Sequence, residues 1–471
     1  MRLVRRHVSV AVAAVVAPLT AVAPACLPDI QFESAAADGG DGSVSFADTG
    51  MPNVDAAPSI IGPFANDQFS DYAQSGRCAV REGTLYCWGG LGSNLTGQLG
   101  LTPDTEDAGE YLLPTAVTMT AQPASQITQL AMGGLHTCTL YGRTTYCRGT
   151  NDDSQLGNPA SQGGPVDVAV QGLPAGGLDF IAAADESTCG ITLLPDAGSP
   201  SNVYCWGSNG EAQLGRPQNQ LPGIAGPVTG ALDGGPTGAI PDAIAIAGGG
   251  DHHCALTSSH VILCWGGTQY YESGPLQGST DCPGGNETTC SDQPQTVTLP
   301  SSEPPEIPVA IALGFVHSCA LAMSGNVYCW GWDNANQLGN TGVTQICTNA
   351  NDNTGPCTGT PVKVANLSGI QLLRAGGVDT CALDQAQHAH CWGYNGDGEL
   401  GEGDTAPQTA PVVVADPQTG SPYTFDDLAV GAEGVCGRSG DTLYCWGNGV
   451  LGTEAPDSGT PTGLSPAPVQ F

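Results

Sequence analysis

Short apolar runs that end in small residues recur along the chain, as at residues 243–250 and 308–314. Each run is followed by two apolar stretches with one cysteine each, often Cys-Ala-Leu and then Val-Tyr-Cys-Trp-Gly or a variant. A loop that usually contains Gln-Leu-Gly comes next, and a stretch beginning Pro-Val or Pro-x-x-Val completes the unit. Short apolar runs bounded by Gly and Pro are typical of strands, so each unit is predicted to contain four strands.

The cysteines give the number of units. Seven close pairs recur, and Trp-Gly follows the second cysteine in six of them, while Arg148-Gly149 follows it in the other. Successive second cysteines are 54 to 65 residues apart, which indicates one repeat architecture rather than several unrelated domains. We therefore predict an all-β fold, a seven-bladed β-propeller of four-stranded antiparallel blades.

The spacing within a pair predicts the register of a hairpin. Between Cys78 and Cys87, eight residues pair off from the outside and leave Glu82-Gly83 as a two-residue turn, for which a Gly is suited. The two cysteines then lie directly opposite each other, where Cα atoms about 4.5 to 5.5 Å apart permit a disulfide. Metal ligation is the alternative, but the Cys-x-x-Cys spacing of zinc sites is absent.

Two further cysteine pairs lie in insertions of the fourth and fifth units. The predicted disulfides are Cys78–Cys87, Cys138–Cys147, Cys189–Cys205, Cys254–Cys264, Cys282–Cys290, Cys319–Cys329, Cys347–Cys357, Cys381–Cys391 and Cys436–Cys445. This many disulfides indicates an oxidising, extracytoplasmic compartment. Of the 19 cysteines, only Cys26 is then left over.

Composition and charge narrow the class of protein. With 68 Gly and 36 Pro in 471 residues, the chain is not a coiled coil or a helical bundle, and its 40% hydrophobic residues exclude disorder throughout. Eleven Lys and Arg stand against 45 Asp and Glu, so the formal net charge is −34. Nucleic acid would be repelled, whereas a basic protein would be attracted.

The first residues predict export. Residues 1–25 have a basic start followed by an Ala/Val-rich stretch, as in a signal peptide, and Cys26 follows the small residues Ala23-Pro24-Ala25. This arrangement resembles the cleavage box of bacterial lipoproteins and implies lipidation of Cys26, with residues 26–60 as a flexible tether and 61–471 as the propeller. Ordinary cleavage after Ala25, which would release a soluble secreted protein, is the alternative.

Two stretches carry a family resemblance. Gly-Gly-x-His-Thr-Cys-x-Leu at 133–140 and Val-Tyr-Cys-Trp-Gly-x₅-Gln-Leu-Gly at 327–339 resemble the regulator of chromosome condensation repeat family. That resemblance implies a seven-bladed propeller without a catalytic set. The fourth unit departs from the pattern, because 270–274 (Tyr-Tyr-Glu-Ser-Gly) replaces Gln-Leu-Gly, and 450–452 shortens it in the seventh. The founding member is a nuclear exchange factor, a role that export and acidity disfavour here, whereas a secreted bacterial inhibitor in the family binds β-lactamases.

Titratable residues gather at the turn before the first cysteine of each hairpin. The histidines are His136, His252, His253 and His317, and the carboxylates are Asp185, Glu186, Asp251, Asp379 and Glu433. A structural role for the histidines and a solvated acidic rim are favoured over a zinc or cation site. A calcium-like stretch at 349–355 lacks the Glu that such loops require. No catalytic motif is present, so we predict neither an enzyme nor a cofactor.

The two cysteine-bearing insertions should emerge on the same face as these turns. Their disulfides would order the loops before binding, which makes the face a candidate recognition surface, although decorative insertion is equally compatible. The candidate residues are Asp251, His252, Asn286, Glu287, Asn351 and Asp352. Tyr270, Tyr271, Trp332 and Tyr394 would suit either sugar stacking or packing.

The function predicted from the sequence is protein binding or scaffolding by an exported, lipid-anchored propeller at the cell envelope. The expected partner is an unknown and basic protein, with no nucleic acid, membrane contact only through the lipid, and a monomeric chain. The alternatives are a structural envelope lipoprotein and a carbohydrate-active or metal-dependent enzyme. Ring closure is expected between a degenerate first strand at 69–73 and the last strand at 468–471, which should lie beside the first hairpin.

Overall fold

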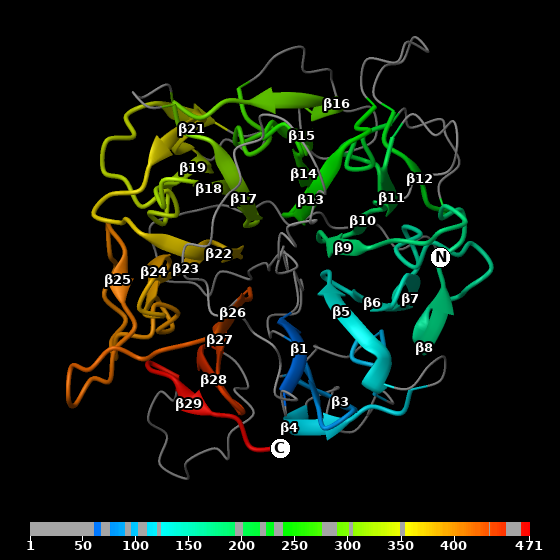
Figure 1. The fold of residues 1–471 in the computed structure, drawn as a ribbon, viewed down its shortest axis with the longest axis horizontal. Helices are drawn as coiled ribbons and strands as arrows, with labels where there is room; N and C mark the ends of the chain where they lie inside the picture. The colour runs from blue at the N-terminus through cyan, green and yellow to red at the C-terminus, as the bar shows by residue number, and fades with distance from the viewer. Residues whose placement is uncertain are drawn as a thin grey trace, which may run out of the picture.

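The computed structural model describes residues 61–66, 76–89, 96–101, 111–119, 124–193, 201–216, 223–229, 239–275, 290–300, 305–348, 354–432, 434–448 and 463–471. These residues form seven antiparallel sheets arranged as the blades of one ring (Figure 1). The predicted seven-bladed all-β propeller is confirmed.

The first four blades each contain four consecutive strands. Their bounds are β1 (Ile61–Asn66), β2 (Gly76–Arg81), β3 (Thr84–Gly89) and β4 (Tyr111–Ala116) in blade 1; β5 (Ile127–Met132), β6 (His136–Tyr141), β7 (Thr144–Gly149) and β8 (Gly164–Ala169) in blade 2; β9 (Phe180–Ala183), β10 (Ser187–Ile191), β11 (Val203–Gly207) and β12 (Gly226–Pro227) in blade 3; and β13 (Ala243–Gly248), β14 (His252–Thr257), β15 (Ile262–Gly267) and β16 (Cys290–Val297) in blade 4. A short 3-10 helix, η1 (Ala124–Gln126), precedes β5.

The last three blades follow the same order, with one extra strand in blade 5. Their bounds are β17 (Pro308–Leu313), β18 (His317–Ala322), β19 (Val327–Trp332), β20 (Ile346–Thr348) and β21 (Thr354–Lys363) in blade 5; β22 (Ile370–Gly376), β23 (Asp379–Asp384), β24 (Ala389–Gly393) and β25 (Val412–Val413) in blade 6; and β26 (Asp427–Val430), β27 (Gly434–Ser439), β28 (Thr442–Gly447) and β29 (Ala467–Pro468) in blade 7. In blade 5 the added strand β20 pairs outside β21.

The first strand of blade 1 differs from the sequence prediction. It is β1, which pairs with β2 through Phe64 opposite Ala79 and Ala65 opposite Cys78, so the place beside β2 that was expected for 69–73 is taken by residues 61–66. Residues 69–73 themselves lie outside the described residues. The sequence did not indicate β1 because Gly62 and Pro63 ordinarily count against a strand, whereas its pairing with β2 is a contact between separate segments.

The hairpins have the register that the cysteine spacing predicts. In all seven blades the two cysteines are directly opposite, and they form disulfides with Cα atoms 4.1 to 4.2 Å apart. The tight turns use positive φ, as at Glu82 (49°) and Gly83 (76°). Cys347–Cys357 is an eighth disulfide. Cys290 is also disulfide-bonded, whereas Cys282 lies outside the described residues.

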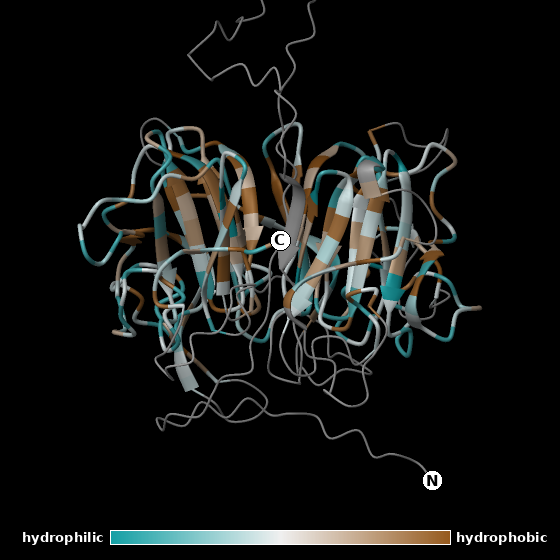
Figure 2. Ribbon diagram, turned by 90° about the horizontal axis from the view of Figure 1, so that it is seen from below, coloured by the Kyte–Doolittle hydropathy of each residue, from teal (hydrophilic) through white to brown (hydrophobic). Residues whose placement is uncertain are grey.

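The hydrophobic core lies between the blades, where apolar strands run from one face of the ring to the other (Figure 2). Seven clusters of buried side chains each combine residues of two neighbouring blades. The cluster between blades 7 and 1 contains Trp88 and Val469, and the ring of Phe471 lies 5.4 Å from that of Tyr86. The prediction that the last strand lies beside the first hairpin is therefore confirmed.

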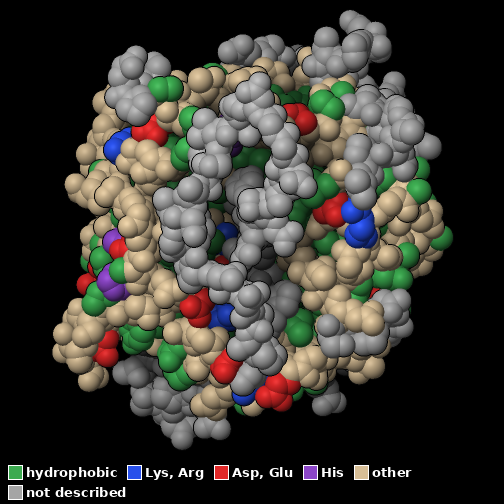
Figure 3. Space-filling view, viewed as in Figure 1, with side chains coloured by type: hydrophobic (Ala, Val, Ile, Leu, Met, Phe, Trp, Pro, Cys, Tyr) green, Lys and Arg blue, Asp and Glu red, His purple; other side chains and the backbone are tan. Residues whose placement is uncertain are grey.

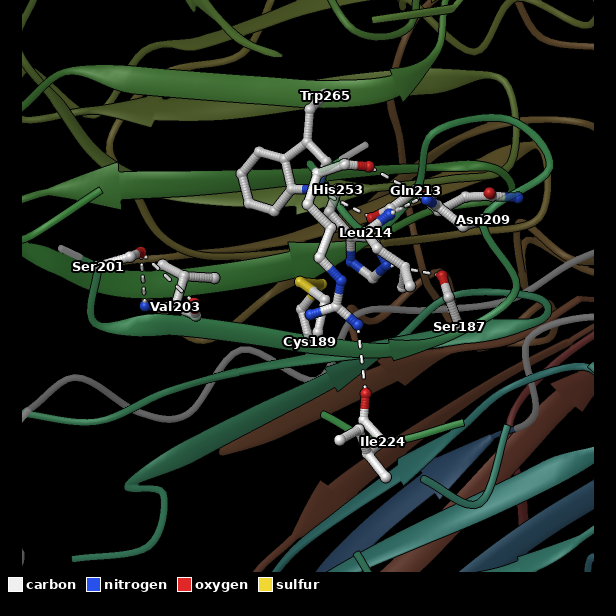
Figure 4. The surroundings of a disulfide bond; sticks show 12 residues. Ser187, Cys189, Ser201, Val203, Asn209, Gln213, Leu214, Ile224, His253 and Trp265 are labelled. Atoms are coloured by element: carbon white, nitrogen blue, oxygen red, sulfur yellow. Dashed lines mark hydrogen bonds between the residues drawn. A yellow bond between two sulfur atoms is a disulfide. The ribbon is translucent and has the colours of Figure 1, made fainter. Parts of the chain in front are cut away.

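A hydrogen bond from a buried tryptophan links each of four blades to the one before it. The indole Nε1 of Trp265 donates to the backbone oxygen of Gln213 at 2.9 Å (Figure 4). The equivalent bonds, also 2.9 Å, run from Trp330 to Glu272, from Trp392 to Gln337 and from Trp446 to Glu399. All four acceptors lie at the first position of a Gln-Leu-Gly loop or its counterpart. This loop is therefore where the tryptophan of the following blade is hydrogen-bonded.

The Gln side chain in turn shapes its own loop. The Oε1 atom of Gln213 accepts a hydrogen bond from the backbone N–H of Glu211, two residues earlier, at 2.9 Å. In blade 4 the carboxylate of Glu272 accepts the corresponding bond from Tyr270 at 2.7 Å. Residues 272–274 are thus the counterpart of Gln-Leu-Gly in blade 4, within the stretch 270–274 that the sequence pattern places at this position.

The glycine after Trp265 is required by a close approach of two chain segments. Gly266 has φ = 104°, in the region that favours glycine, and a Cβ atom at this position would collide with the backbone oxygen of Asp251. Cys-Trp-Gly therefore combines a disulfide, a blade-to-blade hydrogen bond and a tight backbone crossing in three consecutive residues.

Blade 2 replaces the tryptophan by a buried ion pair. Arg148 and Asp167 lie with Nη1 and Oδ1 3.4 Å apart, and their side chains are 1% and 2% exposed. Arg148 reaches the loop of blade 1, because a Cβ atom at Gly100 would lie 2.6 Å from its Nη1. The strand registers align Asp167 with Pro114, Pro294, Pro361, Pro411 and Pro466 in five of the blades that have Trp. Blade 2 thus has Arg and Asp at the two positions where these five blades have Trp and Pro.

We predict that the double variant Arg148→Trp/Asp167→Pro is more stable than the parent by about 1 to 4 kcal/mol, because a buried ion pair often contributes less than well-packed apolar groups. Each single variant should lose about 3 kcal/mol or more, since it leaves the other charge buried without its partner. Urea unfolding gives the free energy of unfolding of the parent, the two single variants and the double variant. If the effect of the double variant equals the sum of the two single effects, the coupling of Arg148 with Asp167 is contradicted.

Candidate functional site

The turns between the first and second strands and the loops between the third and fourth strands emerge on one side of the ring, which we call the loop face. The opposite side, with the hairpin turns of the paired cysteines, is the hairpin face. In blades 2 to 5 the turn is closed by a hydrogen bond across four residues, as from Gly249 N to His252 O at 2.9 Å. The first strand of each blade is the innermost one, so the central residues of these turns surround the middle of the ring, and we call them the rim of the loop face (Figure 1).

Backbone hydrogen bonds join these turns around the ring. Gly134 N donates to Asp185 O (2.9 Å), Asp185 N to Gly250 O (3.2 Å), Gly250 N to Phe315 O (3.3 Å) and Phe315 N to Gly377 O (2.7 Å). The rim from blade 2 to blade 6 is therefore held by main-chain contacts that do not depend on the identity of the side chains. A surface ordered in this way loses little entropy when it binds a ligand.

The histidines at these turns are buried and connect neighbouring blades. His136 Nε2 is 2.8 Å from Thr188 Oγ1, and His317 Nε2 is 2.8 Å from Thr380 Oγ1. Burial lowers the pKa of His136 to about 4 and that of His317 to about 3. These imidazoles stay neutral in the folded protein, so their contribution to stability is complete above about pH 6.5 and is lost as the pH falls.

His252 and His253 are arranged in the same way. His252 Nε2 lies 2.8 Å from Ser318 Oγ of blade 5, and His253 Nε2 lies 2.9 Å from Ser187 Oγ of blade 3 (Figure 4). Both side chains are fully buried, and burial lowers both pKa values, that of His253 to about 3. His252 was a candidate residue of the binding face, but its side chain contacts the next blade and does not reach the surface.

The carboxylates of the turns have different surroundings. Asp251 Oδ1 accepts a hydrogen bond from Gln213 Nε2 at 2.9 Å, and burial raises the pKa of Asp251. Asp379 is 1% exposed, and burial together with the charge of Glu399 raises its pKa well above the usual range. Asp185 is half-buried and Glu186 is exposed, whereas Glu433 lies outside the described residues. Within the described ranges, no three His, Cys, Asp or Glu side chains are placed to hold a metal ion.

Two buried glutamates occupy positions where other blades have Gln. Burial raises the pKa of both Glu272 and Glu399 to about 8. The Oε2 atom of Glu399 accepts from the backbone N–H of Asp397 at 2.9 Å, as a Gln oxygen does elsewhere. A protonated carboxyl group reproduces the amide's combination of acceptor and donor, which explains why Glu is compatible with this loop.

The insertion of blade 5 is fixed on the loop face by a separate apolar cluster. The disulfide Cys347–Cys357 packs with Val316, Trp332 and the half-buried Tyr270, Tyr271, Phe315 and Val378. The rings of Tyr270 and Trp332 lie 4.7 Å apart in an edge-to-face contact. Trp332 is therefore a packing residue. The side chains come from blades 4, 5 and 6, so the insertion lies beside the turns, as the strand order predicts.

Four of the six candidate binding residues lie outside the described residues: Asn286, Glu287, Asn351 and Asp352. Sequence reasoning also missed the apolar turn residues Phe315, Val316 and Val378. A comparison of the two turn positions that precede each first-arm His or its counterpart could have found them, because Phe and Val occur there only in blades 5 and 6.

No helix among the described residues has the length and apolarity that a membrane crossing requires.

We predict that Glu399→Gln stabilises the protein in a pH-dependent way. The folded state keeps a proton on Glu399 up to about pH 8, while the unfolded chain releases it near pH 4.5, so the parent loses stability as the pH rises between these values. The variant should be more stable than the parent by about 1 to 3 kcal/mol at pH 8 and nearly equal to it at pH 4. Urea unfolding at both pH values tests this, with the exposed Glu82→Gln as control. A gain of the same size at both pH values would contradict the mechanism.

Comparisons with known proteins agree with this fold. Two family models of the regulator of chromosome condensation (RCC1) repeat match residues 82–140 and 309–337. The ultraviolet-B receptor UVR8 of Arabidopsis thaliana is 25% identical over 385 residues, 79% of this chain and 75% of that protein. The secretion-regulating guanine nucleotide exchange factor of Bos taurus is 26% identical over 373 residues, 73% of this chain and 72% of that protein. The probable E3 ubiquitin-protein ligase HERC6 of Homo sapiens is 25% identical, but the match covers 62% of this chain and only 26% of that protein.

Solved structures show the same architecture. Prp20p from Saccharomyces cerevisiae superposes with a TM-score of 0.57 at 19% identity, covering 76% of this chain and 77% of that one. Human WBSCR16 superposes with a TM-score of 0.61 at 16% identity, covering 82% and 95%. At this identity the likeness concerns the fold. The relatives include receptors, exchange factors and ligases, so the absence of catalysis stays a prediction. The chain carries RCC1 repeats folded as a seven-bladed β-propeller.

Proposed function

We propose that the protein is an exported, lipid-anchored module that binds a protein partner at the cell envelope through its loop face. The observation that carries this proposal is the insertion of blade 5, whose disulfide is packed against side chains of three blades. An insertion that only lengthened a loop would not need its own disulfide and its own apolar cluster. Rigid loops on a rigid scaffold favour recognition, because little conformational freedom is lost on binding.

The binding partners of related proteins support binding as the general role. Prp20p has binding properties to Gsp1p and histones, and yeast RCC1 (Prp20) has been solved with Kap60 bound to it. In this chain the histidines and Asp251 of the described turns are hydrogen-bonded between blades, which favours a structural role for them over a catalytic one. Protein binding through side chains of a face is therefore the most economical proposal.

Export is supported by the disulfides. Each of the seven blades has a disulfide across its hairpin, and such bonds persist in oxidising compartments. The anchor is proposed from residues 1–26 alone, which lie outside the described residues. A lipid on Cys26 would hold the propeller at a membrane, with residues 26–60 as a tether.

The binding proposal predicts the effect of removing the insertion. Replacing 347–357 by a short Gly/Ser linker should abolish capture of the partner that the parent isolates from an envelope extract, since the rigid surface is lost. The matched control replaces the exposed Met323 by Ala on the hairpin face and should leave capture unchanged. Thermal unfolding verifies that both variants remain folded. Undiminished capture by the insertion variant would place recognition elsewhere, and no captured partner at all would favour a purely structural envelope protein.

The anchor makes a separate prediction. The parent should remain with membranes until detergent is added and should carry the mass of a lipid on Cys26, whereas Cys26→Ser should be released in soluble form. Membrane fractionation and mass spectrometry of the N-terminal peptide measure both properties. Detergent-free release of the parent, equal to that of the variant, would indicate ordinary secretion.

A further inference from the structure

The rim of the loop face changes character from blade to blade at its two central turn positions. These pairs are Gly134 and Leu135 in blade 2, Asp185 and Glu186 in blade 3, Gly250 and Asp251 in blade 4, Phe315 and Val316 in blade 5, and Gly377 and Val378 in blade 6. Blade 3 therefore presents two carboxylates, and blades 5 and 6 present apolar side chains. The turns of blades 2 to 5 are closed by the same backbone hydrogen bond, so among these four blades the difference lies in the side chains. In blade 6 the turn has Gly377 at φ = 49°.

The apolar sector comprises Tyr270, Tyr271, Phe315, Val316 and Val378. They belong to one contiguous cluster, and all of them except Val316 are only partly buried. Phe315 extends over the neighbouring turn, because a Cβ atom at Gly250 would collide with its ring. A group of partly exposed aromatic and aliphatic side chains on a rigid base is typical of an interaction surface.

The acidic sector comprises Asp185 and Glu186 of blade 3. It is continuous with the apolar sector, because Asp185 N donates to Gly250 O and Gly250 N donates to Phe315 O. Glu186 is exposed and Asp185 is half-buried. The two sectors thus form one strip along the rim, acidic at blade 3 and apolar at blades 5 and 6.

Positive charge is kept away from this strip. Eight of the eleven Lys and Arg residues lie in the described part of the chain, and four of them are buried: Arg77, Arg148, Arg216 and Arg374. The other four lie at the hairpin ends of their strands: Arg81 opposite Thr84, Arg143 in the turn after β6, Lys363 opposite Tyr328, and Arg438 opposite Leu443. Figure 3 shows Lys and Arg side chains lying beside Asp and Glu side chains on one face of the ring. Among the described residues, the loop face therefore has no accessible cation.

We propose that the rim from blade 3 to blade 6 binds a cationic segment of a protein partner, in which an apolar side chain lies within a few residues of Lys or Arg. The apolar side chain packs on the apolar sector, and the cationic groups lie near Asp185 and Glu186. The charge of the strip selects against acidic segments, and its apolar half selects against segments that are only basic. This inference rests on the proposed function and adds to it the chemistry of the partner.

The test uses the purified mature protein and three synthetic peptides of about 12 residues, composed of Lys and Leu, of Lys and Ser, or of Glu and Leu. Fluorescence anisotropy should give an affinity for the Lys/Leu peptide at least tenfold higher than for the other two. That affinity should fall when salt is added, because part of it is electrostatic. Equal binding of the Lys/Leu and Lys/Ser peptides would reduce the effect to net charge and would overturn the proposal.

Variants assign the binding to the strip. Phe315→Gly introduces the residue that occupies the same position in blades 2, 4 and 6, so the turn should keep its backbone. It should weaken Lys/Leu binding at least fivefold with the salt dependence unchanged. Asp185→Asn/Glu186→Gln should weaken binding and flatten the salt dependence. Met323→Ala and Asp441→Asn on the hairpin face are the matched apolar and acidic controls and should change neither quantity.

A second measurement does not depend on any variant. A Lys/Leu peptide with a photoreactive group should cross-link to the parent protein at 185–186, 270–271 or 315–316, as read by mass spectrometry. Cross-links confined to the hairpin face or to residues 26–60 would overturn the proposal. If Phe315→Gly still captures the envelope partner as the parent does, this inference fails while the proposed function stands. If the parent captures no partner, the proposed function fails first.

Discussion

Four of the seven blades are joined to the blade before them by one repeated contact, the hydrogen bond from a buried indole N–H to the backbone oxygen at the start of the neighbouring Gln-Leu-Gly loop. In blade 3 the indole of Trp206 is buried at the same position without this hydrogen bond. The contact joins a strand of one blade to a loop of the blade before it, so it fixes both the spacing and the angle between them. The apolar clusters that form the core fill the space that this contact leaves between blades. Blade 2 shows that the contact is replaceable, since Arg148 with Asp167 occupies the same place at the cost of two buried charges.

The sequence predicted the blades because their determinants are local. Eight or nine residues between two cysteines suffice to define a hairpin, and six Trp-Gly pairs mark its end. It failed where the determinant is distant. The strand β1 contains Gly62 and Pro63 and is held in place by pairing with β2. Within the stretch 270–274, the hydrogen bond that Glu272 accepts shows that this residue takes the place of Gln. Local propensity contains neither of these contacts.

The candidate site was predicted only in part, and the reason is burial. A turn with Asp251 and His252 next to each other suggests an accessible polar site, yet His252 is fully buried against Ser318 and Asp251 is bonded by Gln213. Sequence shows which residue types share a turn but not which of them points between two blades. The apolar rim residues were missed for the opposite reason, because Phe315 and Val378 look like ordinary core residues until the structure shows them half-exposed.

Within each turn, one residue contacts the neighbouring blade and the two residues before it lie at the rim of the loop face, which explains how such a fold can acquire binding specificity. The residue that begins the second strand, such as His136 or His317, contacts the next blade and is restricted by that contact. The two residues before it are held through their backbone, by hydrogen bonds that Gly, Asp and Phe all make at the first position. Substitution at these two positions therefore changes the surface with little effect on the ring, except where a glycine such as Gly250 lies against its neighbour. Gly, Asp and Phe all occupy the first of them in this one chain, so the rim is the part of the molecule where binding properties can vary most freely.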